Sequence, residues 1–187
     1  MIEFLIQAYA LKDTVRTGWT LRGVDRPESV GDHAWGTALL CLLAGPAAGV
    51  DVARCVSMAV VHDLAECITG DFPALQDTIS AEDKARLEAQ AMETLARLCT
   101  PLSGLAPDIS NVQALWQEYE ARQTPEALLV RDLNLVDMAL QALVYETQRR
   151  QGTSLKEFFV TTEARLATAT GRRLFQAIAE RRDGGSR

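Results

Sequence analysis

The chain has 187 residues, 48% of them hydrophobic and 24% charged, which fits one globular domain and excludes disorder over most of its length. Its formal charge of −6 argues against binding to a nucleic acid polymer, because contacts to a phosphate backbone require positive charge. No apolar stretch is long enough to cross a bilayer, and the N-terminal run lacks the basic region of a signal peptide. We therefore expect a cytoplasmic protein with no membrane partner.

Helical periodicity dominates the chain. Apolar residues recur at the i, i+3, i+4 spacing, whereas alternating, strand-like stretches are scarce. We predict an all-α fold, a single compact domain of about six to eight helices over residues 1–182, followed by a disordered tail over 183–187. The predicted helices cover residues 2–12, 33–44, 52–69, 81–98, 109–122 and 126–150, with one or two more between 154 and 182.

The predicted helix boundaries decide where the polar residues lie. The loop over 13–32 is rich in Arg, Gly, Pro and Asp, and loops of that length in a compact domain often carry function. Asp32 is the predicted N-cap of helix 33–44, which ends at Gly45 and Pro46. The apolar helix 52–69 is bounded by Asp51 and Gly70, and a turn follows over 71–73.

Both histidines of the chain stand in informative positions. His33 begins a helix after the long loop, and His62 lies within the most apolar helix, followed by Asp63, Glu66 and Asp71. Burial of these polar groups is costly unless they pair or bind a cation. One interpretation is a hydrogen-bonded core histidine beside a solvated Asp63. The other is a metal site, because two neutral imidazoles with carboxylates suit Mn, Fe, Co, Ni or Zn.

Longer strings carry a resemblance to a known family. The pattern His33 with His62-Asp63 resembles the HD-domain metal-dependent phosphohydrolases, and several strings resemble their 5'-deoxynucleotidase branch, in the same order over about residues 1–150. These strings are Arg16-Thr-Gly-Trp19, Pro27-Glu-Ser-Val-Gly-Asp-His33, Val61-His-Asp-Leu-Ala-Glu-Cys-Ile-Thr-Gly-Asp71 and Met138-Ala-Leu-Gln-Ala-Leu-Val-Tyr-Glu146.

The resemblance implies a function and roles for individual residues. It implies release of the 5'-phosphate from (deoxy)nucleoside monophosphates by metal-bound water, with one divalent ion (Mn, Co, Fe, Ni, Zn or Mg) and a homodimeric assembly. His33, His62 and Asp63 match metal ligands, Glu66 and Asp71 match catalytic and substrate-contacting acids, and Arg16, Trp19 and Glu28 match loop positions near the phosphate and sugar. Trp19 could equally be a core aromatic residue.

One position departs from the family pattern. The fourth metal ligand of the family is an aspartate in a string like Lys-x-x-Asp-x-x-x-Met, and alignment with Val130–Met138 places Asn134 there. An asparagine can bind a metal through its carbonyl oxygen but brings no charge, so weaker metal retention is expected. Asp137 could replace it after a local shift, whereas Asp132 should point to the opposite side of the helix.

Two alternatives to the 5'-nucleotidase stay open. The chain could be an HD hydrolase for another phosphorylated small molecule, such as a modified nucleotide, or a catalytically impaired module that binds nucleotides, which Asn134 favours. Elsewhere the pattern favours structural roles, and the charged helix from Glu82 to Arg97 is interpreted as a solvated face.

Overall fold

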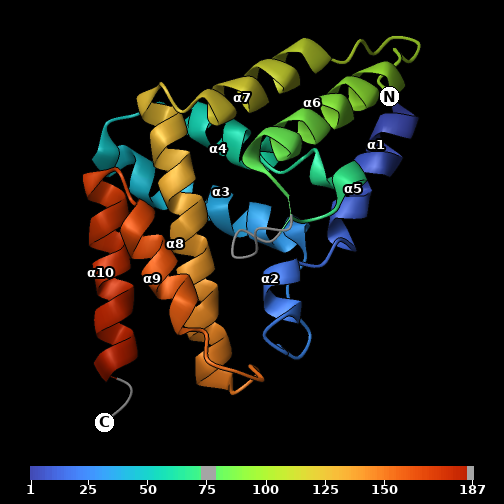
Figure 1. The fold of residues 1–187 in the computed structure, drawn as a ribbon. Coiled ribbons are helices and arrows are strands. Elements are labelled where there is room, and N and C mark those ends of the chain that lie inside the picture. Colours follow the sequence, from blue (N-terminus) through green and yellow to red (C-terminus); the bar gives the residue numbers. More distant parts are fainter. Residues whose placement is uncertain (73–78, 185–187) are drawn as a thin grey trace.

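A computed structural model describes residues 1–72 and 79–184, and Figure 1 shows that this part of the chain is built from helices. Within it the chain makes two isolated β-bridges but no strand, so the all-α prediction is confirmed. Eight α-helices have eight or more residues: α1 (Ile2–Tyr9), α3 (Val30–Ala48), α4 (Val52–Val61), α6 (Ala81–Leu98), α7 (Ile109–Ala121), α8 (Pro125–Gln148), α9 (Lys156–Arg165) and α10 (Ala169–Gly184). The described residues also form three short elements: η1 (Ala10–Lys12), α2 (Thr17–Thr20) and α5 (Glu66–Thr69).

The long helix α8 forms the centre of the molecule. One side of it packs against α3, α4 and α7, and another against α9 and α10, which run beside it in Figure 1. Its buried apolar side chains, among them Leu129, Leu133 and Val136, belong to two of the three hydrophobic clusters. Because α3, α4 and α8 share this core, polar residues on their facing turns are brought together.

The start and end of α3 differ from the prediction. The helix begins at Val30 and not at His33, because Ser29 is the N-cap and forms a capping box with Asp32. The prediction took the third residue of this box for the cap. Pro46 lies inside the helix, which ends when Gly49 adopts a left-handed φ of 71°.

The predicted helix over 52–69 is wrong as one continuous element. It is divided into α4 and α5 by turns at residues 62–65, where amide donors bond carbonyls three residues earlier, as from Leu64 to Val61 and from Glu66 to Asp63. His62 therefore lies at the end of α4 and not in the middle of a helix. Apolar periodicity continues through such turns, so it could not reveal them.

The predicted loop over 13–32 is closed at its base. Val15 and Ser29 form an antiparallel bridge, and the Arg16 amide donates to the Glu28 carbonyl at 3.1 Å. The single-turn helix α2 lies inside this loop. The closure places the two loop segments side by side at the start of α3.

At the other end of the chain, α10 continues to Gly184, two residues into the predicted tail. Residues 185–187 of that tail, and residue 73 of the predicted turn over 71–73, lie outside the described residues. None of the helices described here combines the length and the apolar character that a membrane crossing needs.

Candidate metal and phosphate site

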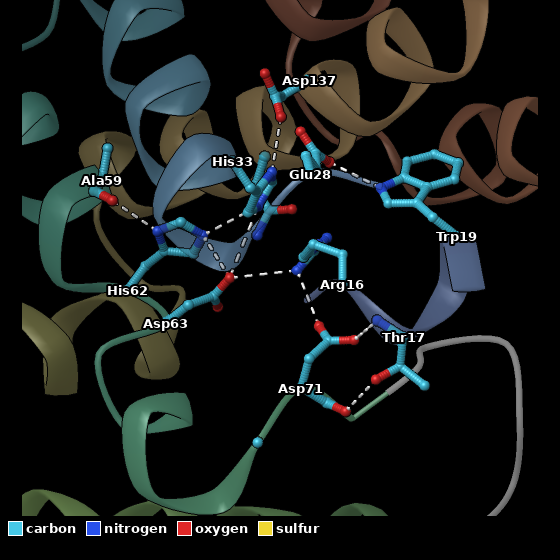
Figure 2. Close-up of polar contacts among 12 residues, drawn as sticks. Arg16, Thr17, Trp19, Glu28, His33, Ala59, His62, Asp63, Asp71 and Asp137 are labelled. Atoms are coloured by element: carbon cyan, nitrogen blue, oxygen red, sulfur yellow. Dashed lines mark hydrogen bonds and ion pairs between the residues drawn. The ribbon is translucent and has the colours of Figure 1, made fainter. Parts of the chain in front are cut away.

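His33 is fully buried in the first turns of α3, and its ring is fixed by Asp137 of α8. The His33 Nδ1 lies 2.7 Å from the Asp137 carboxylate, a contact drawn in Figure 2. With the proton on Nδ1 and the carboxylate accepting it, Nε2 keeps its lone pair. Burial, followed by the positive charge of Arg16, lowers the pKa of His33, so the neutral ring is favoured.

His62 is held in the complementary way by its own helix. Its Nδ1 donates to the carbonyl oxygen of Ala59 at 2.7 Å, which leaves Nε2 with the free lone pair. Asp63 follows in the turn, and its Oδ2 lies 3.2 Å from His62 Nε2. Burial acts to lower the pKa of His62, but the Asp63 carboxylate outweighs it and raises the pKa.

Three possible ligand atoms form a compact triangle in Figure 2. His33 Nε2 and His62 Nε2 are 3.4 Å apart, and Asp63 Oδ2 lies 3.7 and 3.2 Å from them. Ligands about 2.1 Å from a tetrahedral metal ion are separated by about 3.4 Å, so the triangle has the size that a divalent cation requires. Two facing lone pairs without a proton between them repel, and a cation removes that repulsion. The donor set therefore fits a metal ion.

Arg16 and Asp71 form the next layer around the triangle. Arg16 Nη1 lies 3.4 Å from Asp63 and 3.2 Å from Asp71, and the Thr17 amide donates to Asp71 at 2.7 Å. His62, followed by His33 and Arg16, holds the pKa of Asp63 well below its usual range, although burial acts in the opposite direction. Asp63 is therefore a carboxylate at neutral pH.

Glu66 is a buried acid beside this layer. It is 4% exposed, and its Oε2 has no hydrogen-bond partner among the described residues. Burial, followed by the charges of Asp63 and Asp71, raises the pKa of Glu66 well above its usual value. A carboxyl group with its pKa raised in this way keeps its proton more readily and can exchange it with a bound molecule.

Trp19 and Glu28 connect the loop to the helical core. Trp19 is 1% exposed, lies 4.2 Å from the Phe158 ring between centroids, and donates from Nε1 to Glu28 at 2.8 Å. Burial, followed by the charge of Asp137, raises the pKa of Glu28 to about 7. Trp19 is thus a core residue that also lines the cavity described below, so the two roles considered from the sequence are compatible.

The three polar residues of α8 considered for the fourth ligand position have different surroundings. Asn134 lines the cavity, and its Nδ2 donates to the Tyr119 hydroxyl at 2.8 Å. Asp137 contacts Nδ1 of His33, on the side of the ring away from Nε2, so in this structure it does not take the place of Asn134. Asp132 points away, as expected, and accepts hydrogen bonds from the amides of Ala167 and Thr168.

A cavity of about 280 Å³ opens next to the triangle. Sequence reasoning missed much of its lining, including Tyr119, whose ring lies 5.1 Å from that of His62. The interpretation of residues 82–97 as a wholly solvated face is wrong, because Lys84 and Glu88 also line the cavity. A signal was present, since these two residues continue the stripe of Ala91 and Leu95, which are buried. The lining also includes three arginines that the sequence did not single out: Arg122, Arg131 and Arg165.

The chain is similar to known proteins in sequence and in fold. A 5'-deoxynucleotidase HDDC2 from Danio rerio is 40% identical over 165 residues, which are 88% of this chain and 79% of the relative. The protein of that name from Homo sapiens is 37% identical over 163 residues, which are 87% and 76% of the two chains. The crystal structure of the PH0347 protein from Pyrococcus horikoshii superposes with a TM-score of 0.76 at 31% identity, covering 96% of this chain and 99% of that one. A family model described as HD domain matches residues 8–172, and the chain therefore belongs to the HD domain family.

Proposed function

We propose that this protein is a metal-dependent phosphohydrolase that removes the 5'-phosphate from (deoxy)nucleoside monophosphates. The observation that carries the proposal is the triangle of His33 Nε2, His62 Nε2 and Asp63 Oδ2 at the edge of a cavity. The names of the relatives from zebrafish and human support the substrate class.

His33, His62 and Asp63 would hold one divalent cation. Two imidazoles and one carboxylate favour Mn, Fe, Co, Ni or Zn over Mg, which prefers oxygen ligands. Such a cation would polarise the phosphate and make a water molecule more acidic. The three residues together bring a single negative charge, so positive charge remains to attract a phosphate dianion.

Further residues would bind the substrate and move protons. Arg16 lies between Asp63 and Asp71 and would place positive charge beside the phosphate. Glu66 would hold a proton at Oε2 and exchange it with the attacking water or with the leaving 5'-oxygen. Trp19, fixed by Glu28, would present an apolar wall to the sugar.

A second candidate is a module that binds nucleotides without hydrolysing them. The observation that favours it is Asn134, an uncharged side chain next to the candidate metal site, hydrogen-bonded to Tyr119. An HD hydrolase acting on another phosphorylated small molecule uses the same residues and differs only in the shape of the ligand.

A phosphate-release screen distinguishes these functions. Deoxy- and ribonucleoside 5'-monophosphates are offered with Mn or Co to the protein, to Glu66→Gln and to Asn134→Asp. We expect turnover that falls by about 10²- to 10⁴-fold in Glu66→Gln. No turnover with any nucleotide, in the protein or in Asn134→Asp, rejects the proposal. Tight nucleotide binding without turnover supports the binding module.

The assembly and location of the protein are part of the proposal. We propose a homodimer, supported by an exposed apolar stripe on α3 made of Trp35, Leu39, Leu42 and Leu43. A cytoplasmic location stays a prediction, which imaging of the tagged full chain would check.

A further inference from the structure

Three arginines converge on the cavity from different helices. Arg122 is the C-cap of α7, Arg131 lies on α8 and Arg165 ends α9. Arg131 is half-buried and donates from Nη1 to the backbone oxygen of Arg165 at 3.1 Å, which fixes its position. Burial, followed by the positive charges of Arg122 and Arg165, lowers the pKa of Arg131. The positive charges of Arg122 and Arg165 therefore both act on Arg131.

The acidic residues of this region leave most of that charge uncompensated. The Asp132 carboxylate is engaged with Ala167 and Thr168, and Glu118 pairs with Arg54. Glu88 and Glu120 also line the cavity, and Glu88 pairs with Lys84. Among the described residues, no salt bridge joins Arg122, Arg131 or Arg165 to an acid. In a chain of net charge −6, this concentration of positive charge indicates a binding site for an anion.

The arginines lie beyond the metal end of the cavity. Tyr119 and Asn134 are hydrogen-bonded next to His62, and Arg122 and Arg131 are each three residues further toward the connection between α7 and α8. Three residues are almost one helical turn. The backbones of the two arginines are therefore displaced, along each helix, by about 5 Å from the backbones of Tyr119 and Asn134. At the opposite end, the cavity lining contains the acids Asp63, Glu66 and Asp71, and Arg16 pairs with two of them. The cavity thus has an acidic end, which suits a cation, and a basic end.

We propose that Arg122, Arg131 and Arg165 form a second anion subsite, which binds a second phosphate group on a nucleotide. The first phosphate would lie at the metal end, and this placement rests on the proposed function. A monophosphate would occupy that end alone, whereas a nucleoside 5'-diphosphate or a 3',5'-bisphosphate would reach both ends. Guanidinium groups suit this role because they bind phosphate oxygens in pairs.

Calorimetric binding to Mn-loaded protein tests the subsite. The ligands are phosphonate analogues of deoxyadenosine that resist hydrolysis: one like the 5'-monophosphate, one like the 5'-diphosphate and one like the 3',5'-bisphosphate. We expect at least one of the two analogues with two phosphate-like groups to bind about tenfold or more tightly than the analogue of the monophosphate. That ratio of affinities matches one or two additional charge-assisted hydrogen bonds. The ratio of the two affinities should fall close to one in the double variant Arg131→Gln, Arg165→Gln.

The double variant Arg173→Gln, Arg181→Gln is the matched control, because it also removes two positive charges, from exposed positions on α10, and should keep the ratio. Thermal melting of each variant reports folding separately. A ratio of one in the unmodified protein overturns the proposal. An equal loss of affinity for all three analogues in the double variant Arg131→Gln, Arg165→Gln also overturns it. The arginines would then bind the phosphate-like group that all three analogues share. The analogues report binding even if no nucleotide is hydrolysed, so this result is independent of the phosphate-release screen.

Discussion

Asp137 determines which nitrogen of His33 carries the proton. Its carboxylate lies 2.7 Å from Nδ1, so Nε2 faces His62 and Asp63 as an acceptor. Loss of such an outer partner typically lowers metal affinity by about 10- to 100-fold. We expect a decrease of this size for Asp137→Asn in calorimetric titration with Zn or Co. Asp25→Asn, at an exposed carboxylate that pairs with Arg26, is the control, and equal affinities in both variants would contradict this role.

Glu28 links the loop to the pH dependence of stability. Burial and then Asp137 raise its pKa from an ordinary value of 4.5 to about 7 in the folded protein. The folded state therefore binds the proton more tightly than the unfolded state, and the free energy of unfolding falls as pH rises from about 4.5 to 7.

Glu28→Gln keeps an oxygen for the Trp19 Nε1 donor but cannot ionise. In metal-free protein, its melting temperature should rise relative to that of the unmodified protein as pH increases from about 5 to 8. A temperature difference that stays constant over this range would contradict the raised pKa of Glu28.

Residue identity and spacing indicated part of the site but not its extent. His33, His62 and Asp63 stood out because the chain has two histidines and because polar groups in an apolar segment need partners. Tyr119 and Arg131 gave no such signal, since their approach to the site depends on how α7 and α8 pack. Asn134 could be named from the resemblance, but its bond to Tyr119 required the structure.

At the scale of elements, the close approach of α3 and α8 depends on Gly36. A Cβ atom at this position would lie 2.1 Å from Oδ1 of Asp137, so any larger residue displaces that carboxylate. We expect Gly36→Ala to lower both metal affinity and thermal stability. If the added methyl group acts through Asp137, its effect on metal affinity should nearly vanish in an Asp137→Ala background, and a fully additive double-mutant cycle would refute this explanation.

The sequence was enough to predict which segments form helices, but it predicted the ends of those helices less well. The helical periodicity of the long segments survives in α6, α7 and α8 within a few residues of the predicted limits. The starts and breaks were set by local hydrogen bonds that periodicity does not record. The Ser29 capping box and the turn at His62 are the two examples that change the position of a candidate ligand.

At the scale of the whole molecule, the apolar stripe on α3 predicts self-association. Trp35 is 70% exposed and Leu43 is 72% exposed, a large apolar area for a surface that meets only water. In light scattering coupled to gel filtration, we expect about twice the chain mass of 20.5 kDa for the protein and the monomer mass for Leu42→Glu. Val160→Glu, at an exposed position on α9, should leave the mass unchanged. A monomeric unmodified protein would contradict the dimer.

The central claim is that two imidazoles and Asp63 hold a catalytic cation. The most direct test adds Co²⁺ stepwise to metal-free protein and follows the visible spectrum and phosphate release together. We predict that both signals rise to a plateau at one ion per chain, and that His62→Ala and Asp63→Ala lose both. Phosphate release that is unchanged without metal, or a full spectrum and full turnover in those two variants, would contradict it.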